Sequence, residues 1–311
     1  MPDIDTVAAD LGRRFADMDC RLGLQVTALD GDATLAWNAG APFAMASVFK
    51  VLVALELFAQ IEAGEIDGAE RLTITPQMAT AGPSGLSTFS HPAELSLIDL
   101  ARLMLSISDN TAGDVLLARV GVERVNARAA AAGCRDTVVR GAFRAMIDAV
   151  AVELGFADYA ELLSGRARAL GSDARRRASL ENTGFDACAG LDPVRATRAT
   201  AADMAGLMAA VWRDEVASAA ACASLRRGMA AQMTTRVRPA LAGATAFASK
   251  TGSLFGRIRH EVGAVEDADG RAFSFAVLTQ AAVPVTDGER IEALMGTTLN
   301  EALQALGARL S

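Results

Sequence analysis

Alternating apolar and polar residues near both ends of the chain predict two β-hairpins. The first is the stretch RLGLQVTALDGDATLAWNAG, in which two alternating runs flank Asp30-Gly31. The second is RIRHEVGAVEDADGRAFSFAVLTQA, with Asp269-Gly270 between its runs. Asp-Gly between alternating runs is a strong hairpin signal, because both residues tolerate the positive φ angles of a tight turn. The two ends of the chain are therefore expected to supply strands.

Between the hairpins, apolar residues recur at helical spacing. The segments with this pattern are about 46–63, 96–106, 110–119, 122–132 and 203–232, and further helices are expected at about 5–18 and over DGERIEALMGTTLNEALQAL near the C-terminus. This order predicts an α/β (α+β) fold in which an antiparallel sheet from both chain ends is flanked by helices, with a helical subdomain inserted. We expect residues 1–311 to form one domain, with a sheet lobe at about 1–45 and 235–311 and a helical lobe at about 46–234.

Composition narrows the possible functions. The chain has 311 residues, 51% of them hydrophobic, which is enough for a sizeable core. A net charge of −7 and a pI near 5.0 argue against a nucleic-acid binder and against attraction to an anionic membrane surface. The N-terminus lacks the basic and then apolar pattern of a secretory signal. A cytoplasmic location is expected, or a periplasmic one if the true start lies upstream.

The cysteines and histidines form no metal-binding pattern. The four cysteines lie far apart without a C-x-x-C pair, and only two histidines could join them: Cys20, Cys134, Cys188, Cys222, His91 and His260. No metal or other cofactor is predicted, and cysteines in a cytoplasmic chain are expected to be reduced. The sequence indicates no oligomeric state.

One section departs from the rest in composition. Residues at about 141–185 are rich in alanine and arginine and include the triplet Arg175-Arg176-Arg177. Such a run is typical of a solvated face, and a lid or partner surface is the alternative.

The chain has only two lysines among its 30 lysine and arginine residues, Lys50 and Lys250. A base that gives up its proton near neutral pH cannot be arginine, whose pKa is above about 12. In Ser47-Val48-Phe49-Lys50 the serine and the lysine are three residues apart, so a helix beginning at about Ala46 would set the amine beside the hydroxyl. A lysine held neutral there could activate the serine, and a capping serine with a first-turn lysine is the alternative.

Two further clusters are candidates for the same site. Ser108-Asp109-Asn110 falls between two predicted helices, where it could be a helix cap or could supply a proton-relaying hydroxyl and an orienting amide. Lys250-Thr251-Gly252-Ser253 falls on a predicted strand, where it could be a plain strand end or could bind a substrate carboxylate.

Ser-x-x-Lys, Ser-Asp-Asn and Lys-Thr-Gly in this order resemble the signature set of penicillin-binding proteins and class A β-lactamases. Stretches such as LSLIDLARLMLSISDNTAGDVLL are similar to that family as well, and the resemblance covers about residues 20–308 apart from the Arg/Ala-rich section. It implies a β-lactamase-like fold and a serine hydrolase that opens a β-lactam or related amide through an acyl-enzyme. The implied partner is a small molecule with an amide or ester and a carboxylate.

The resemblance also implies a role for each motif residue. Ser47 would be the acylated nucleophile, Lys50 its general base, and Ser108 the group that passes a proton to the leaving nitrogen. Asn110 would hold the substrate side-chain amide, Lys250 and Thr251 would bind the carboxylate, and Gly252 would let the ligand approach. The backbone N–H groups of Ser47 and Ser253 would form the oxyanion hole.

The family's deacylating Glu-x-x-Leu-Asn pattern is not reproduced. The comparable segment is RRRASLENTGFDACAG, where Asn182 would place the glutamate at Ala178 and leave Glu181 displaced. Two other activities therefore stay open, a serine amidase, esterase or acyltransferase on a small metabolite and a covalent β-lactam binder with little turnover. A Ser-His-Asp hydrolase is disfavoured because the chain has no G-x-S-x-G motif.

Overall fold

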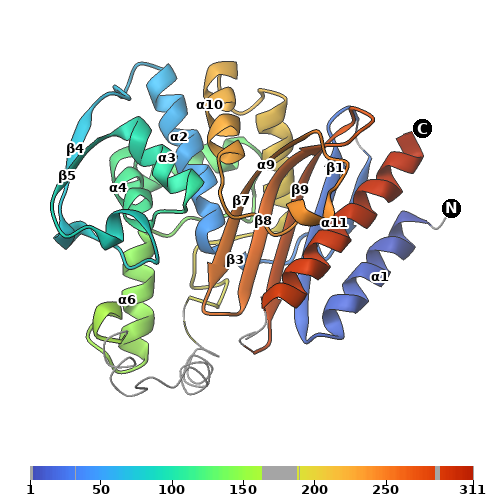
Figure 1. Cartoon of the computed structure of the whole chain (residues 1–311), viewed down its shortest axis with the longest axis horizontal. Coiled ribbons are helices and arrows are strands. Elements are labelled where there is room, and N and C mark those ends of the chain that lie inside the picture. The colour runs from blue at the N-terminus through green and yellow to red at the C-terminus, as the bar shows by residue number, and fades with distance from the viewer. Residues whose placement is uncertain (1–2, 32, 163–187, 189, 284–287, 311) are drawn as a thin grey trace.

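A five-stranded antiparallel sheet joins the two ends of the chain in the computed structural model, which describes residues 3–31, 33–162, 188, 190–283 and 288–310 (Figure 1). Its strands are β1 (Cys20–Ala28), β2 (Thr34–Trp37), β7 (Ala246–Leu254), β8 (Ile258–Glu266) and β9 (Ala272–Ala281), in the order β2-β1-β9-β8-β7. Both predicted hairpins are confirmed, since β1 pairs with β2 and β8 with β9. β1 and β9 bring the two ends together, with Leu24 opposite Val277.

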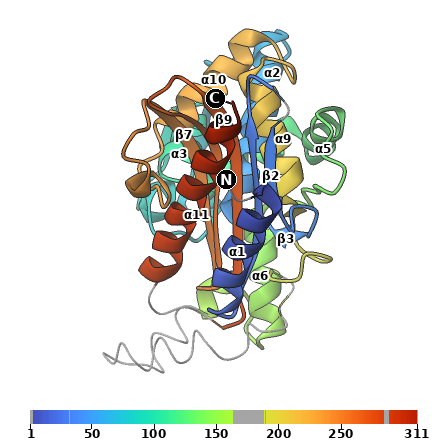
Figure 2. The same ribbon diagram turned by 90° about the vertical axis from the view of Figure 1, so that its right-hand side faces the viewer.

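The terminal helices cover one face of this sheet. α1 (Ile4–Ala16) and α11 (Gly288–Leu310) lie side by side in Figures 1 and 2. Fully buried apolar side chains such as Leu11, Phe275 and Leu299 fill the space between helices and strands. The two terminal helices therefore bury their apolar faces against this face of the sheet, as the expected α/β fold requires.

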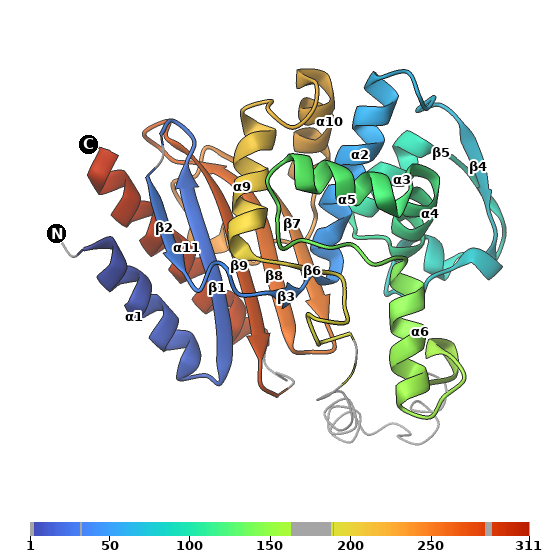
Figure 3. The same ribbon diagram turned by 180° about the vertical axis from the view of Figure 1, so that it is seen from behind.

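The helical part lies on the other side of the sheet (Figure 3). Its helices are α2 (Lys50–Glu62), α3 (Leu97–Ser106), α4 (Asn110–Val120), α5 (Val122–Ala131), α6 (Phe143–Glu153), α9 (Ala201–Trp212) and α10 (Ala219–Ala230), with the 3₁₀ segments η1 (Ala46–Phe49), η2 (Pro76–Met78), η3 (Gly85–Thr88) and η4 (Arg238–Ala240). α2 runs through the middle of the second core, and ten of its residues are buried. This near-complete burial explains why its sequence is apolar around most of its circumference.

The single helix predicted at 203–232 is wrong. The chain forms α9 and α10 instead, separated by residues 213–218. Asp214 adopts a left-handed φ of 59°, which a helix cannot include, and the Ser218 side chain caps α10 by accepting a hydrogen bond from the N–H of Ala221 at 3.1 Å. Helical periodicity continues across the break, so only the charged turn and the capping serine could have indicated from the sequence that one helix ends and another begins.

Four short strands have no counterpart in the sequence prediction. β3 (Phe43–Ala44) pairs with β6 (Arg198–Ala199), and β4 (Arg71–Ile74) pairs with β5 (Ala93–Ser96). β3 and β6 have two residues each, which is too few to show a period of two, and β4 and β5 have four each, the shortest run in which alternation can be read. Of the Arg/Ala-rich section, α6 is described, whereas Arg175-Arg176-Arg177 lies outside the described residues.

Replacing Gly206 with alanine is expected to stabilise the protein by about 0.5–1 kcal/mol. Gly206 is exposed on α9, and no atom lies within 4 Å of an added Cβ, so the change removes only the excess conformational freedom of glycine. Equilibrium unfolding in urea measures the effect. Gly228→Ala on α10 is the comparison, because its Cβ would lie 2.3 Å from Leu105 Cδ1 and should remove the gain. Equal effects at the two sites would contradict the prediction.

Candidate active site

Ser47 and Lys50 sit where the chain leaves a short strand and enters the central helix. Ser47 is in η1, Lys50 is the first residue of α2, and Lys50 Nζ donates a hydrogen bond to Ser47 Oγ at 3.2 Å. The preceding residue, Ala46, has a left-handed φ of 46°, which marks a strained turn. His260 holds this turn through a 2.8 Å hydrogen bond between its Nε2 and the carbonyl of Ala44.

Lys50 is fully buried and surrounded by hydrogen-bond acceptors. Its Nζ lies 2.5 Å from the carbonyl oxygen of Ser108, 3.2 Å from Ser108 Oγ and 2.7 Å from Asn110 Oδ1. Burial lowers the pKa of Lys50 from 10.5 to about 7, while the carboxylates of Asp109 and Asp114 act in the opposite direction. The amine is therefore poised to bind and release a proton near neutral pH.

Ser108-Asp109-Asn110 forms the turn between α3 and α4, as the sequence predicts. Asp109 caps α4, because its Oδ1 accepts from the N–H of Ala112 at 3.0 Å and its Oδ2 from the N–H of Leu86 at 2.7 Å. Ser108 has a left-handed φ of 60°, and its hydroxyl faces Lys50. The cap and the candidate catalytic groups are thus different residues of one motif, and the two interpretations do not compete.

Lys250 enters the site from β7, the last strand in the sheet order. It is fully buried, and its Nζ donates to the carbonyl oxygen of Thr251 at 3.0 Å. Burial lowers the pKa of Lys250, and the nearby charges of Lys50 and Arg236 lower it further. Burial, rather than the charge of Lys250, is also the leading cause of the lowered pKa of Lys50. The charge of Lys50 thus lowers the pKa of Lys250, but by less than burial does.

Gly252 brings β7 against the backbone of the nucleophile turn. An added Cβ there would lie 3.1 Å from the Ser47 nitrogen, 3.2 Å from the Met45 oxygen and 3.2 Å from the Val48 nitrogen. All three neighbours are backbone atoms, so they cannot turn aside as a side chain would. The close approach sets the end of β7, with exposed Ser253, beside the N–H of Ser47.

Arg236 belongs to the site although its sequence gave no sign of this. Its Nη2 donates to Ser253 Oγ at 2.5 Å and its Nη1 to the carbonyl oxygen of His260 at 2.9 Å, and it forms an ion pair with Glu292 at 3.0 Å. Only 8% of Arg236 is exposed. Among so many arginines no local pattern distinguishes this one, because its position depends on how the segment before β7 packs on the sheet.

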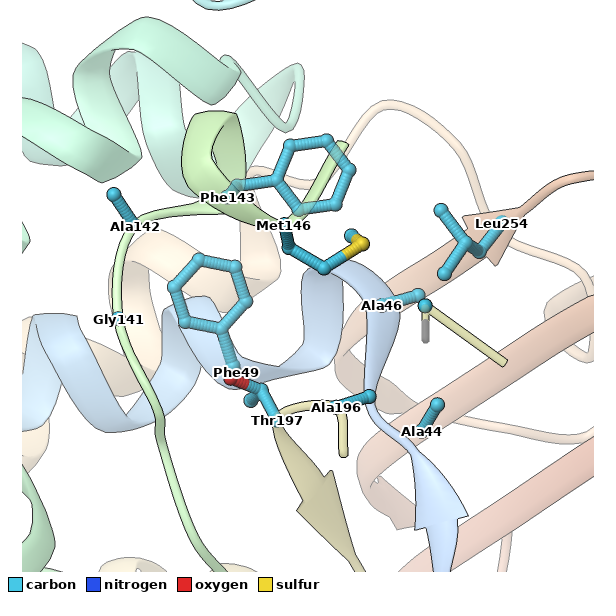
Figure 4. Close-up of a pocket in the computed structure, with 11 residues that line it drawn as sticks. Ala44, Ala46, Phe49, Gly141, Ala142, Phe143, Met146, Ala196, Thr197 and Leu254 are labelled. Carbon is cyan, nitrogen blue, oxygen red and sulfur yellow. The ribbon is translucent and has the colours of Figure 1, made fainter. Parts of the chain in front are cut away.

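A cleft of about 420 Å³ opens at the ends of these elements. Asn110 and Ser253 line it together with apolar residues of α6 and of the turn after β7. A smaller cavity of about 20 Å³ (Figure 4) adjoins it, since Phe143 and Leu254 line both spaces. Ala178, Glu181 and Asn182 lie outside the described residues, so the departure from the family's deacylating pattern stays a prediction.

Within the described part of the chain, no group of three or more His, Cys, Asp or Glu residues is placed to hold a metal ion, and the four cysteines are buried and unpaired. Burial raises the pKa of Cys20 to about 11 and that of Cys134 to about 12, which makes these thiols poor nucleophiles. No helix among the described residues is both long and apolar enough to cross a bilayer.

The chain is similar to known proteins over most of its length. The model of a family described as the beta-lactamase enzyme family matches residues 6–305. A beta-lactamase regulatory protein, BlaB, of Streptomyces cacaoi is 36% identical over 264 residues, which cover 80% of this chain and 81% of that protein. Among solved structures, a beta-lactamase from Sphaerobacter thermophilus DSM 20745 matches with a TM-score of 0.75 and 25% identity over 99% of each chain. A mutant of PBP-A in an acyl-enzyme complex with penicillin G has the same fold, with a TM-score of 0.73, 20% identity and coverage of 98% and 99%.

Proposed function

Because this chain belongs to the beta-lactamase enzyme family, we propose that Ser47 is the residue acylated by a β-lactam. The family and the fold make the chain a serine hydrolase of the β-lactamase and penicillin-binding type. The observation that carries the residue assignment is the buried amine of Lys50, 3.2 Å from both Ser47 Oγ and Ser108 Oγ, with its pKa lowered to about 7. One group can thus receive a proton from the first hydroxyl and reach the second.

The proposed acylation moves one proton and exchanges one bond. Neutral Lys50 takes the proton from Ser47 Oγ as that oxygen attacks the lactam carbonyl carbon. The carbon–nitrogen bond of the ring then breaks, and the proton passes from Lys50 through the Ser108 hydroxyl to the leaving nitrogen. Asn110 accepts from Lys50 at 2.7 Å, which holds the amine between the two hydroxyls.

Substrate charge would be met on the β7 side of the site. Lys250 and Thr251 are proposed to bind the carboxylate, with Arg236 adding a second cation through its bond to Ser253. A bound carboxylate would raise the pKa of Lys250 and keep its amine charged. The N–H groups of Ser47 and Ser253 are proposed to stabilise the oxyanion, a contribution of about 3 kcal/mol per donor in other hydrolases.

Intact-protein mass spectrometry after mixing with benzylpenicillin tests the proposal. We expect the protein mass to rise by the mass of the penicillin, and peptide mapping to place the adduct on the peptide that contains Ser47. An adduct on another residue, or none at any time, would refute the assignment. Decay of the adduct measures turnover and so distinguishes a working β-lactamase from a covalent binder. The distinction matters because one sequence relative is named a regulatory protein and one structural neighbour, a mutant, was captured as an acyl-enzyme. The comparisons do not favour an amidase or esterase on a small metabolite.

The acylation rate is expected to rise with pH and to level off above about pH 7. The pKa of Lys50 is lowered to about 7, so below this pH the amine carries a proton and cannot accept another. Each unit below it should reduce the rate about tenfold. Single-turnover measurements with a saturating chromogenic cephalosporin between pH 5 and 9 would show the inflection. A rate independent of pH across this range would exclude Lys50 as the base.

We also propose that residues 1–311 act as one catalytic domain, which requires both lobes because Ser47 and Lys250 come from different ones. A cytoplasmic location stays a prediction, and cell fractionation with an antibody to the chain would test it.

A further inference from the structure

Glu261 of β8 is a fully buried carboxylate to which the proposed acylation assigns no part. β8 lies beside β7 in the sheet (Figure 1) and pairs with it so that Glu261 is opposite Thr251. Opposite residues of a ladder point to one face of the sheet, and so do residues two positions along either strand. Glu261 therefore shares a face with three hydroxyl-bearing residues of β7, which are Ser249, Thr251 and Ser253.

Three hydrogen bonds hold the Glu261 carboxylate in place. Ser249 Oγ donates to its Oε1 at 2.6 Å, and the backbone N–H groups of Arg236 and Val237 donate to its Oε2 at 2.7 and 3.0 Å. Burial raises the pKa of Glu261, while these bonds and the charge of Arg236 act in the opposite direction. One oxygen thus ties two consecutive backbone amides to the sheet.

These two amides belong to the segment that carries Arg236 into the site. Residues 231–237 connect α10 to η4 as a loop, so their N–H groups depend on partners outside a helix or a ladder. A buried N–H group without a partner is costly, and Glu261 supplies the partner for both Arg236 and Val237. The carboxylate therefore fixes the point from which the Arg236 side chain leaves the backbone.

The Arg236 guanidinium reaches Ser253 from this fixed point, with Nη2 donating to Ser253 Oγ at 2.5 Å. Its ion pair with Glu292 of α11 is a weaker constraint, because Arg259 Nε also lies 3.3 Å from the same carboxylate oxygen. The Glu292 side chain is 35% exposed, and shared, solvent-exposed ion pairs hold side chains loosely. The direction of Arg236 thus depends chiefly on the backbone that Glu261 holds.

The charge of Glu261 acts on the same cations. It raises the pKa of Lys250 and that of Arg236, against a larger lowering by burial. Loss of this charge would lower the pKa of Lys250, but it would also remove a repulsion on a substrate carboxylate. The two effects on carboxylate binding oppose each other, so we expect the reach of the Glu261 side chain to matter more than its charge.

We infer that Glu261 is a positioning residue for the carboxylate-binding side of the site: by holding the backbone of Arg236 and Val237, it sets the Arg236 guanidinium beside Ser253. The role rests on the proposed function, because the substrate carboxylate that it serves is placed on β7 there. Glu261 itself touches no substrate and transfers no proton, since it acts through Arg236.

Two conservative variants separate the reach of Glu261 from its charge. Glu261→Gln keeps the length, and its amide can still accept from both N–H groups and donate to Ser249 Oγ. Glu261→Asp keeps the charge but is one methylene shorter, so it cannot span the same three donors. Glu266→Asp is the matched control, at the opposite end of β8 from the site, where Glu266 accepts from Thr245 at 2.8 Å. Thermal unfolding checks that all three variants fold.

Benzylpenicillin and its methyl ester supply the measurement, because they differ only at the carboxylate. The second-order rate constant of acylation is obtained for each by rapid quenching and intact mass. We expect the wild type to react with benzylpenicillin at least about tenfold faster than with the ester. Glu261→Asp should slow benzylpenicillin about tenfold and leave the rate with the ester within about threefold. Glu261→Gln and Glu266→Asp should keep the wild-type preference.

The outcomes separate the role of Glu261 from the proposed function. Equal slowing of both compounds in Glu261→Asp, or an unchanged preference there, would overturn the role, because a displaced Arg236 should affect only the charged substrate. Loss of the preference in Glu261→Gln would also overturn it, since charge rather than reach would then be responsible. Equal rates in the wild type would overturn the role and the carboxylate site but not the acylation of Ser47. No acylation by either compound would overturn the proposed function as well.

Discussion

A Lys50→Arg variant is expected to form the acyl-enzyme at least about 10³-fold more slowly than the wild type. Arginine keeps the positive charge but holds its proton at any physiological pH, since its pKa is above about 12. It has no lone pair to accept the proton of Ser47. The guanidinium is also larger than the site allows, because α4 approaches so closely at Gly113 that an added Cβ would lie 3.1 Å from Lys50 Cε.

The rate of adduct formation, followed by rapid quenching and intact mass, measures this loss. Ser47→Ala sets the background, and the rate of Lys50→Arg should approach it. The pH dependence of the remaining acylation by the variant should lack the inflection near pH 7. Thermal unfolding checks that the variant still folds, so that a low rate is not the result of misfolding. Acylation within about tenfold of the wild-type rate would show that another group takes the proton.

A Gly252→Ala variant is expected to reduce the acylation rate by about 10²-fold or more, with a small change in the free energy of unfolding. The added Cβ would press on the backbone of Met45, Ser47 and Val48 at 3.1–3.2 Å. This turn cannot shift freely, because Ala46 is already in a left-handed conformation and His260 holds the Ala44 carbonyl. Relief would have to come from β7 moving away, which would widen the proposed oxyanion site between Ser47 and Ser253.

Gly243→Ala is the matched control for this substitution. It lies in the turn just before β7, and the nearest atom to its added Cβ is the Cβ of Ala268 at 3.8 Å, an ordinary contact. We expect the control to acylate at the wild-type rate. If Gly252→Ala also acylates at that rate, the N–H groups at this junction do not form the oxyanion site and the assignment of Ser253 fails.

Much of the fold could be predicted from the chain alone, because its strongest signals are local. Each hairpin needs only alternating residues and an Asp-Gly turn, and both formed where these occur. The helix boundaries at 203–232 were missed since periodicity does not show a break of six residues. The short strands β3 and β6 were missed because pairing with a distant segment, rather than sequence pattern, makes them strands.

The candidate site divides in the same way. Ser47 and Lys50 are three residues apart, so helical geometry alone brings the amine to the hydroxyl, and the motif order pointed to Ser108 and Lys250. The sequence by itself therefore pointed to the groups of the proposed chemistry: the serine, the base and the second hydroxyl. It could do so because each of these groups lies within a short motif whose spacing fixes its geometry.

Tertiary structure decided how strongly that chemistry is tuned and what surrounds it. The pKa of Lys50 falls to about 7 because packing buries it completely, and α4, which is distant in sequence, packs against its side chain at Gly113. Arg236 and the cleft-lining residues of α6 likewise join the site through contacts with segments that are distant in sequence. Desolvation and shape are properties of many segments packed together, so no short motif can encode them.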